Sequence, residues 1–146
     1  MSEGQNGQGV DALGVFGQRF DSEGTPQGSE YQVNTVTSGH QYSPSVAAAA
    51  IGEFVVVWHG RGPSDTVGVF GRFYDSDGNR RGAEFRLNST QSGSQTSASV
   101  GSIGSGDFVG VWTSGGDGSR AGVFGIRVQT GGENGANGAP GTGTRR

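Results

Sequence analysis

The sequence predicts an all-β protein made of tandem repeats, and three observations support this prediction. The tetrapeptide Gly-Val-Phe-Gly begins at Gly14, Gly68 and Gly122, so successive copies start 54 residues apart. Between these landmarks apolar and polar residues alternate with a period of two, and many of the apolar ones are β-branched or aromatic. Gly, Asp, Ser and Asn fill the intervals, as turns between strands require.

The register of the repeat holds without a gap. When residues 14–67 are laid over residues 68–121, about 22 of the 54 positions are identical. The repeats are therefore expected to occupy residues 14–129. The predicted organisation is an N-terminal loop segment, two full repeats, the first strand of a third repeat and a flexible tail rich in Gly, Asn and Thr, at residues 1–13, 14–67, 68–121, 122–129 and 130–146.

Four strands are predicted in each repeat. In the first repeat they are Val15–Asp21, Tyr31–Thr35, Ser45–Ile51 and Phe54–His59, and the second repeat has them 54 residues later. The first two strands are joined by Asp21-Ser-Glu-Gly24, matched by Asp75-Ser-Asp-Gly78 in the second repeat. Both segments predict a hairpin turn with positive φ at the glycine, and Gly52-Glu53 and Gly106-Asp107 predict tight turns.

The fourth predicted strand contains Phe54-Val-Val-Val-Trp58, which is apolar on both faces. Such a strand must be covered on both sides, because neither face can be left in water at low cost. The small side chains of Ser45–Ile51 suit a crowded position beside a central axis, and the alternation in Glu30–Asn34 suits an exposed edge. These features favour a four-stranded antiparallel unit like a β-propeller blade, with a β-solenoid or a sandwich as the alternatives.

Composition excludes several classes of function. Hydrophobic residues make up 30% of the chain, below the roughly 45–50% of typical globular domains, which predicts a lean core or one that another chain completes. There is no cysteine and no lysine, so thiolate chemistry and Schiff bases are excluded. A net charge of −3 gives no general attraction to nucleic acid. The first residues have neither a basic nor an apolar region, so no Sec-type signal peptide is expected in them, and the longest apolar runs are too short for a membrane span to be expected.

Two segments carry a resemblance to a known class of repeats. They are Gly14-Val-Phe-Gly-Gln-Arg-Phe-Asp-Ser-Glu-Gly24 and the stretch from Pro44-Ser-Val-Ala to Phe54-Val-Val-Val-Trp58. They resemble the repeats of large bacterial surface proteins, which stand in long tandem arrays beside cadherin-like and haemolysin-type calcium-binding repeats. The resemblance covers residues 14 to about 128. It implies an extracellular or cell-surface location and a role in adhesion.

No arrangement of residues predicts catalysis. The two histidines, His40 and His59, align with Ser94 and Thr113, so neither belongs to the shared framework of the repeat. A hydrolase triad would have to add Ser43 and Asp65, but no Gly-x-Ser-x-Gly elbow surrounds a serine. We therefore expect a protein that is not an enzyme and has no cofactor.

Three sets of residues are candidates for ligand binding, each with a structural alternative. Trp58 and Trp112 precede glycine-rich loops and could stack on sugars, although the core is favoured because Phe54 and Trp58 share a face of their strand. Asp75, Asp77 and Asn79 have the spacing of the first half of a calcium loop. Because Arg86 stands where the bidentate glutamate should be, plain hairpin chemistry is preferred to calcium.

The third candidate is a group of arginines in the second repeat: Arg72, Arg80, Arg81 and Arg86. They could contact a sulfated glycan, a phosphate or an acidic partner. A solvated hairpin is the preferred interpretation, since no interleaved aromatic residues accompany them.

The predicted function is a non-enzymatic extracellular or cell-surface module that acts by binding or self-assembly. The alternatives are a carbohydrate-binding lectin and the structural subunit of a filament. Two repeats cannot close a propeller, which typically needs four or more blades. The chain is therefore expected to associate with itself, as a ring or as a filament, with a glycan as the alternative partner.

Overall fold

The structure is a computed structural model that describes residues 13–62, 65–89, 93–104, 106–115 and 122–129. These residues form nine strands: β1 (Phe16–Phe20), β2 (Pro26–Gln32), β3 (Gln41–Ala48), β4 (Phe54–Gly62), β5 (Asp65–Tyr74), β6 (Arg80–Arg86), β7 (Gln95–Ser102), β8 (Asp107–Ser114) and β9 (Gly122–Gln129). In this part of the chain no helix is long and apolar enough to cross a membrane. The predicted tail, and the N-terminal segment apart from Leu13, lie outside the described residues.

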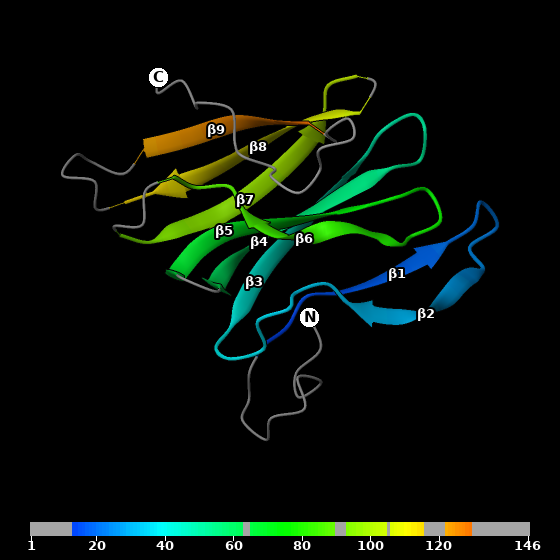
Figure 1. Cartoon of the computed structure of the whole chain (residues 1–146), viewed down its shortest axis with the longest axis horizontal. Helices are drawn as coiled ribbons and strands as arrows, with labels where there is room; N and C mark the ends of the chain where they lie inside the picture. Colours follow the sequence, from blue (N-terminus) through cyan, green and yellow to red (C-terminus); the bar gives the residue numbers. More distant parts are fainter. Residues whose placement is uncertain (1–12, 63–64, 90–92, 105, 116–121, 130–146) are drawn as a thin grey trace.

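The strands form three antiparallel sheets, and every pairing joins strands that are consecutive in the chain. The first sheet contains β1 and β2, the second has the order β3-β4-β5-β6, and the third has the order β7-β8-β9. Figure 1 shows them as layers, with the four-stranded sheet between the two smaller ones. The prediction of an all-β, antiparallel fold is confirmed for the described residues, and the sheets do not close into a barrel.

The predicted hairpin turns are confirmed. Gly24 and Gly78 have φ of 83° and 87°, and each donates its backbone N–H to the carbonyl of the aspartate three residues earlier, over 3.0 Å. The turn between β3 and β4 is closed by a bond of 2.9 Å from the Gly52 N–H to the Ala49 carbonyl. Gly52 also has a positive φ of 87°. Glycine adopts these left-handed conformations without the clash that a Cβ atom would cause.

The second strand of the first repeat begins earlier than predicted. The sequence predicts Tyr31–Thr35, whereas β2 runs from Pro26, directly after the hairpin turn, to Gln32, so the prediction is wrong at both ends of the strand. The register between β1 and β2 shifts between Gly17 and Arg19. Gly28, which lies on β2 opposite this irregularity, has a positive φ of 76°. The strand therefore passes through exposed polar residues that show no apolar alternation, which is why periodicity missed its first half.

Burial on both faces of β4 is confirmed. Val55 and Val57 belong to one hydrophobic cluster, and Val56 and Trp58 belong to another. The first cluster joins the second sheet to the third and contains Ala49, Val55, Val57, Val69, Phe73, Leu87, Ala98, Phe108 and Trp112. The second cluster joins the second sheet to the first and contains Val15, Val33, Val56, Trp58, Phe70 and Tyr74. The two cores hold the three sheets together as one stack.

The small residues of the third predicted strand do not occupy a crowded position on both sides. This strand, β3, runs from Gln41 to Ala48 and is an edge strand of its sheet. One of its faces is open, since Val46 is 64% exposed. The prediction of a crowded inner strand is therefore wrong for this face, because the neighbouring first sheet has only two strands and does not reach across it.

Candidate functional site

A cleft of about 490 Å³ lies between the first sheet and the open face of β3 and β4. All five residues of β1 line it on one side, and Val46, Ala48, Phe54 and Val56 line it on the other. The lining mixes these apolar side chains with polar ones such as Gln18, Arg19 and Ser45, and one wall is a strand. Among the described strands, β1 pairs only with β2, so the backbone of its other edge is free to accept a further strand.

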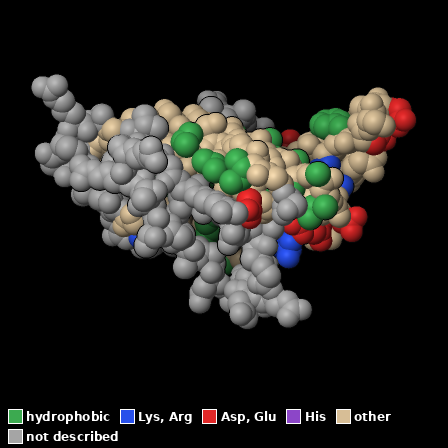
Figure 2. Space-filling view, turned by 90° about the horizontal axis from the view of Figure 1, so that it is seen from above, with side chains coloured by type: hydrophobic (Ala, Val, Ile, Leu, Met, Phe, Trp, Pro, Cys, Tyr) green, Lys and Arg blue, Asp and Glu red, His purple; other side chains and the backbone are tan. Residues whose placement is uncertain are grey.

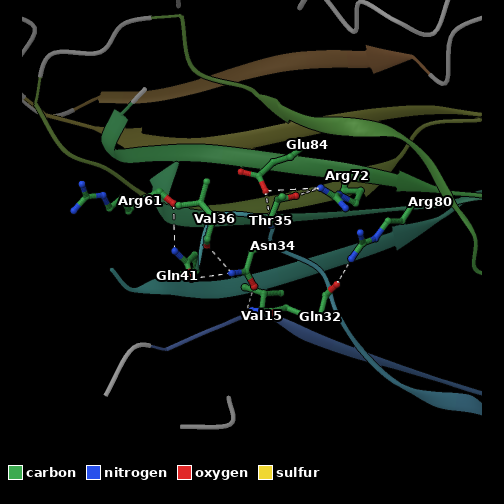
Figure 3. Close-up of polar contacts among 10 residues, drawn as sticks. All are labelled: Val15, Gln32, Asn34, Thr35, Val36, Gln41, Arg61, Arg72, Arg80 and Glu84. Carbon is green, nitrogen blue, oxygen red and sulfur yellow. Dashed lines mark hydrogen bonds and ion pairs between the residues drawn. The ribbon is translucent and has the colours of Figure 1, made fainter. Parts of the chain in front are cut away.

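Polar contacts fix the first sheet to the second below this cleft. Asn34 is buried and accepts a hydrogen bond from the Val15 N–H at 2.9 Å, and its Nδ2 donates to the Gln41 Oε1 at 3.0 Å. Figure 3 shows Asn34 between these two partners. The same arrangement recurs in the second repeat, where Asn88 accepts from the Val69 N–H at 2.8 Å.

These asparagines are not among the residues that the sequence predicts to form a site. The signal that could have found them was a polar pair, Asn and Gln seven residues apart, kept at the same positions of both repeats. A polar side chain that must be buried needs a full set of partners. Each asparagine therefore acts as a clamp between the end of one sheet and the start of the next.

The candidate arginines of the second repeat mostly contact other parts of the same chain. Arg72 is 3% exposed, forms an ion pair of 3.9 Å with Glu84 and donates to the Thr35 hydroxyl. Glu84 in turn accepts a hydrogen bond of 2.8 Å from the Thr35 N–H, as Figure 3 shows. Burial, followed by the nearby Arg80 guanidinium, lowers the pKa of Arg72. This buried set joins β5 and β6 to the loop after β2.

The other candidate arginines differ in their surroundings. Arg80 donates to the Gln32 carbonyl at 2.8 Å, which links the second sheet to the first. Arg81 pairs with Glu53 across the second sheet. Arg86 is half-buried, and its NH1 atom has no hydrogen-bond partner among the described residues. The structure thus does not bring the four arginines together around one open site.

Both tryptophans are buried. Trp58 is 0% exposed and packs near Phe70, with 6.5 Å between the ring centroids. Trp112 is 7% exposed and belongs to the cluster between the second and third sheets. Their placement matches the core interpretation of the sequence, and neither indole presents an open face on which a sugar could stack.

The Asp75 side chain organises its own turn. Its Oδ1 accepts hydrogen bonds from the backbone N–H groups of Asp77 at 2.9 Å and Asn79 at 2.8 Å, and its Oδ2 accepts from the Asn79 side chain at 3.1 Å. These bonds, those from Asn79 above all, lower the pKa of Asp75. Asp21 makes the same two backbone contacts in the first repeat. The carboxylates of both repeats therefore serve the turn directly.

The two histidines lie beside one tyrosine. The rings of His40 and His59 each stack on Tyr42 with 5.6 Å between the centroids. His40 Nδ1 also accepts a hydrogen bond of 3.2 Å from the Leu13 N–H, and burial lowers the pKa of His59. Ser43, which a triad would need, is exposed and has a positive φ of 49° in the bulge of β3. The Asp65 side chain lies outside the described residues.

Hydrophobic side chains near the cleft are exposed although the residues 54 positions later are buried or packed against a core cluster. Phe20 is 59% exposed, whereas its equivalent Tyr74 is 1% exposed. Val46 is 64% exposed, whereas its equivalent Val100 packs against the cluster between the second and third sheets. We call the surface formed by Phe20 and Val46 the N-terminal face.

A second exposed surface lies on the other side of the stack, on the third sheet. Ile103 is 51% exposed and Val111 is 38% exposed, whereas their equivalents Ala49 and Val57 are 6% and 1% exposed. We call the surface formed by Ile103 and Val111 the C-terminal face. Figure 2 shows hydrophobic side chains reaching the surface of the molecule in several places. These two faces correspond to positions that are covered wherever the chain places one sheet on the next.

Comparisons of the chain with protein-family models, with curated proteins and with solved structures found no match. The useful comparison is therefore the one within the chain, between each residue and its equivalent 54 positions away in the other repeat.

Proposed function

We propose that the protein is a non-enzymatic module that binds further copies of itself head to tail, with the C-terminal face of one copy packed on the N-terminal face of the next. One observation carries this proposal. Each face repeats, 54 residues away, one half of an interface that is already buried inside the chain. Because the two faces are unlike, their contact is heterologous, and it gives a ring if the rotation closes or a filament if it does not.

The internal interface serves as the template for this contact. Val100, Phe108 and Trp112 of the third sheet pack on the face of the second sheet that contains Val55 and Val57. A hydrogen bond between backbone and side chain accompanies the packing: the Val100 N–H donates to the Ser45 hydroxyl at 3.3 Å. Between two copies, Val46 would take the place of Val100, and Val111 would take the place of Val57.

The free energy for the association comes from the exposed apolar side chains. Complete burial of a Val, Ile or Phe side chain contributes about 1.5–3 kcal/mol. Phe20, Val46, Ile103 and Val111 would all be covered in the same contact. The free energy gained by burying several such side chains therefore exceeds that of a surface ion pair, which is about 0–1 kcal/mol.

The arrangement of the sheets and the location are part of the same proposal. We propose that successive sheets are placed around a common axis, as the blades of a β-propeller are. The second sheet supports this, since its four strands are paired in the order in which they follow along the chain. The resemblance of the repeat to those of bacterial surface proteins supports an extracellular or cell-surface location and a role in adhesion.

Light scattering after size exclusion tests the proposal. The wild-type chain should have a mass above that of the monomer, rising with concentration in the micromolar range. Val46→Glu and Val111→Glu should each lower the mass, because each places a charge in one half of the contact. The control is Ile51→Glu, since Ile51 is 62% exposed but lies in the β3–β4 turn and does not line the cleft. A wild-type chain that stays monomeric throughout would contradict the proposal.

A further inference from the structure

The edge of β1 that has no partner among the described strands is the feature on which a more specific inference rests. In the second sheet, the equivalent strand β5 is paired on one edge with β4 and on the other with β6. In the first sheet, β1 is paired with β2, which is the equivalent of β6. The edge of β1 that has no described partner is thus the one that would be paired with a strand like β4.

The third sheet contains such a strand. This strand is β8, which is the equivalent of β4 and is paired in the third sheet with β7 on one edge and β9 on the other. The register is conserved between the two sheets, because Trp58 lies opposite Phe70 and Trp112 lies opposite Phe124. In the same way, Val55 lies opposite Phe73, and Val109 lies opposite Arg127.

The sequences of β1 and β9 are nearly interchangeable. The segment from Gly14 reads Gly-Val-Phe-Gly-Gln-Arg-Phe, and the segment from Gly122 reads Gly-Val-Phe-Gly-Ile-Arg-Val. Each therefore carries a strand that fits the edge of β8 in the same register. The difference is that β1 brings a second strand with it, since β2 follows it in a hairpin.

We propose that the association occurs by strand exchange, in which β1 of one copy replaces β9 of another copy beside β8. In the joint, Phe16 lies opposite Trp112 and Arg19 lies opposite Val109. The receiving sheet becomes four-stranded, with the order β7-β8-β1-β2, and repeats the arrangement of β3 to β6. This inference rests on the proposed head-to-tail association and names the strands that form it.

The exchange accounts for the cleft and for the exposed side chain of Phe20. β8 of the partner would run along β1, and all of the residues of β1 line the cleft. In the second sheet, Tyr74 lies opposite Phe54 and stacks on it with 4.8 Å between the ring centroids. The same register places Phe20 opposite Phe108 of the partner, so the exposed Phe20 ring gains the aromatic neighbour that Tyr74 already has.

Disulfide trapping tests the register, because the natural chain has no cysteine. Two single variants, Arg19→Cys and Val109→Cys, are mixed and oxidised under mild conditions. We expect a mixed disulfide between the two variants. Replacing the second variant by Thr113→Cys shifts the cysteine four residues along β8, outside the C-terminal face, and should greatly reduce the yield. Equal yields from the two mixtures would overturn the proposed register.

A second variant tests the exchange itself. Val109→Cys combined with Arg127→Cys places both cysteines in one chain, at facing positions of β8 and β9. Once oxidised, this variant cannot release β9 and should be monomeric, and reduction should restore the association. If the oxidised variant associates like the wild type, the strand exchange is wrong and the head-to-tail association stands. If neither the wild type nor any variant associates, both proposals fail.

Discussion

Replacement of Asn34 by alanine removes the clamp between the first and second sheets. The Val15 N–H and the Gln41 Oε1 both lose their partner, and both residues are buried. A buried polar group without a partner costs about 1–3 kcal/mol. We therefore expect Asn34→Ala to lower the free energy of unfolding by about 2–5 kcal/mol.

Urea unfolding measures this loss, as a fall in the midpoint at unchanged slope. Asn34→Asp is the matched variant, because it keeps the acceptor for the Val15 N–H and removes the donor to Gln41. It should be destabilised at least as much as Asn34→Ala, because its buried carboxylate would face the Val36 carbonyl and the Gln41 Oε1, both of which accept hydrogen bonds from Asn34. Ser38→Ala, at an exposed position of the same loop, should stay within about 0.5 kcal/mol of the wild type. Wild-type stability of Asn34→Ala would refute the role of the clamp.

Three further predictions concern the core, calcium and pH. Trp58→Ala should lower the free energy of unfolding by about 3–5 kcal/mol, and an unchanged stability with a lost binding activity would instead make Trp58 a ligand platform. The melting temperature should be nearly the same in calcium and in chelator, because the Asp75 carboxylate already accepts hydrogen bonds from its own turn; a rise of several degrees in calcium would make Asp75 and Asp77 ligands. Burial lowers the pKa of His59 below its ordinary value of 6.5, because the folded protein disfavours the charged imidazole. Above pH 6.5 the ring is neutral in both the folded and the unfolded state, so this histidine causes no loss of stability there. As the pH falls below 6.5, the unfolded state takes up the proton more readily and the free energy of unfolding decreases. The wild type should lose more stability than His59→Gln between neutral and mildly acidic pH, and parallel curves would contradict this.

The regular part of the fold could be predicted from the sequence because local chemistry determines it. The turns at Asp21 and Asp75 combine an aspartate that caps its own turn with a glycine at positive φ, and both signals lie within four residues. The apolar run at Phe54–Trp58 predicts that both faces of its strand are covered by other parts of the protein. The start of β2 could not be predicted, since Pro26 and its neighbours join the sheet by pairing with β1 across a bulge.

The exposed N-terminal and C-terminal faces could not be predicted from the sequence, because the exposure of a side chain depends on whether another sheet packs on it. Val46 and Val100 are identical in type and in register, yet one is open and the other is packed. The arginines show the same limit. In the sequence, Arg72 could be a surface residue that binds a ligand. In the structure its partner Glu84 lies on the neighbouring strand β6, and its partner Thr35 follows β2 and reaches it only because the first sheet packs on the second.

Mixing two variants tests the central claim of head-to-tail association most directly. Val46→Glu leaves only the C-terminal face intact, and Val111→Glu leaves only the N-terminal face intact. Each variant alone should be a monomer by light scattering. Together they should form a dimer with one copy of each, which cannot grow further because the remaining two faces both carry a charge. A mixture that stays monomeric, or in which a single variant associates as well as the wild type does, would contradict head-to-tail association through these faces.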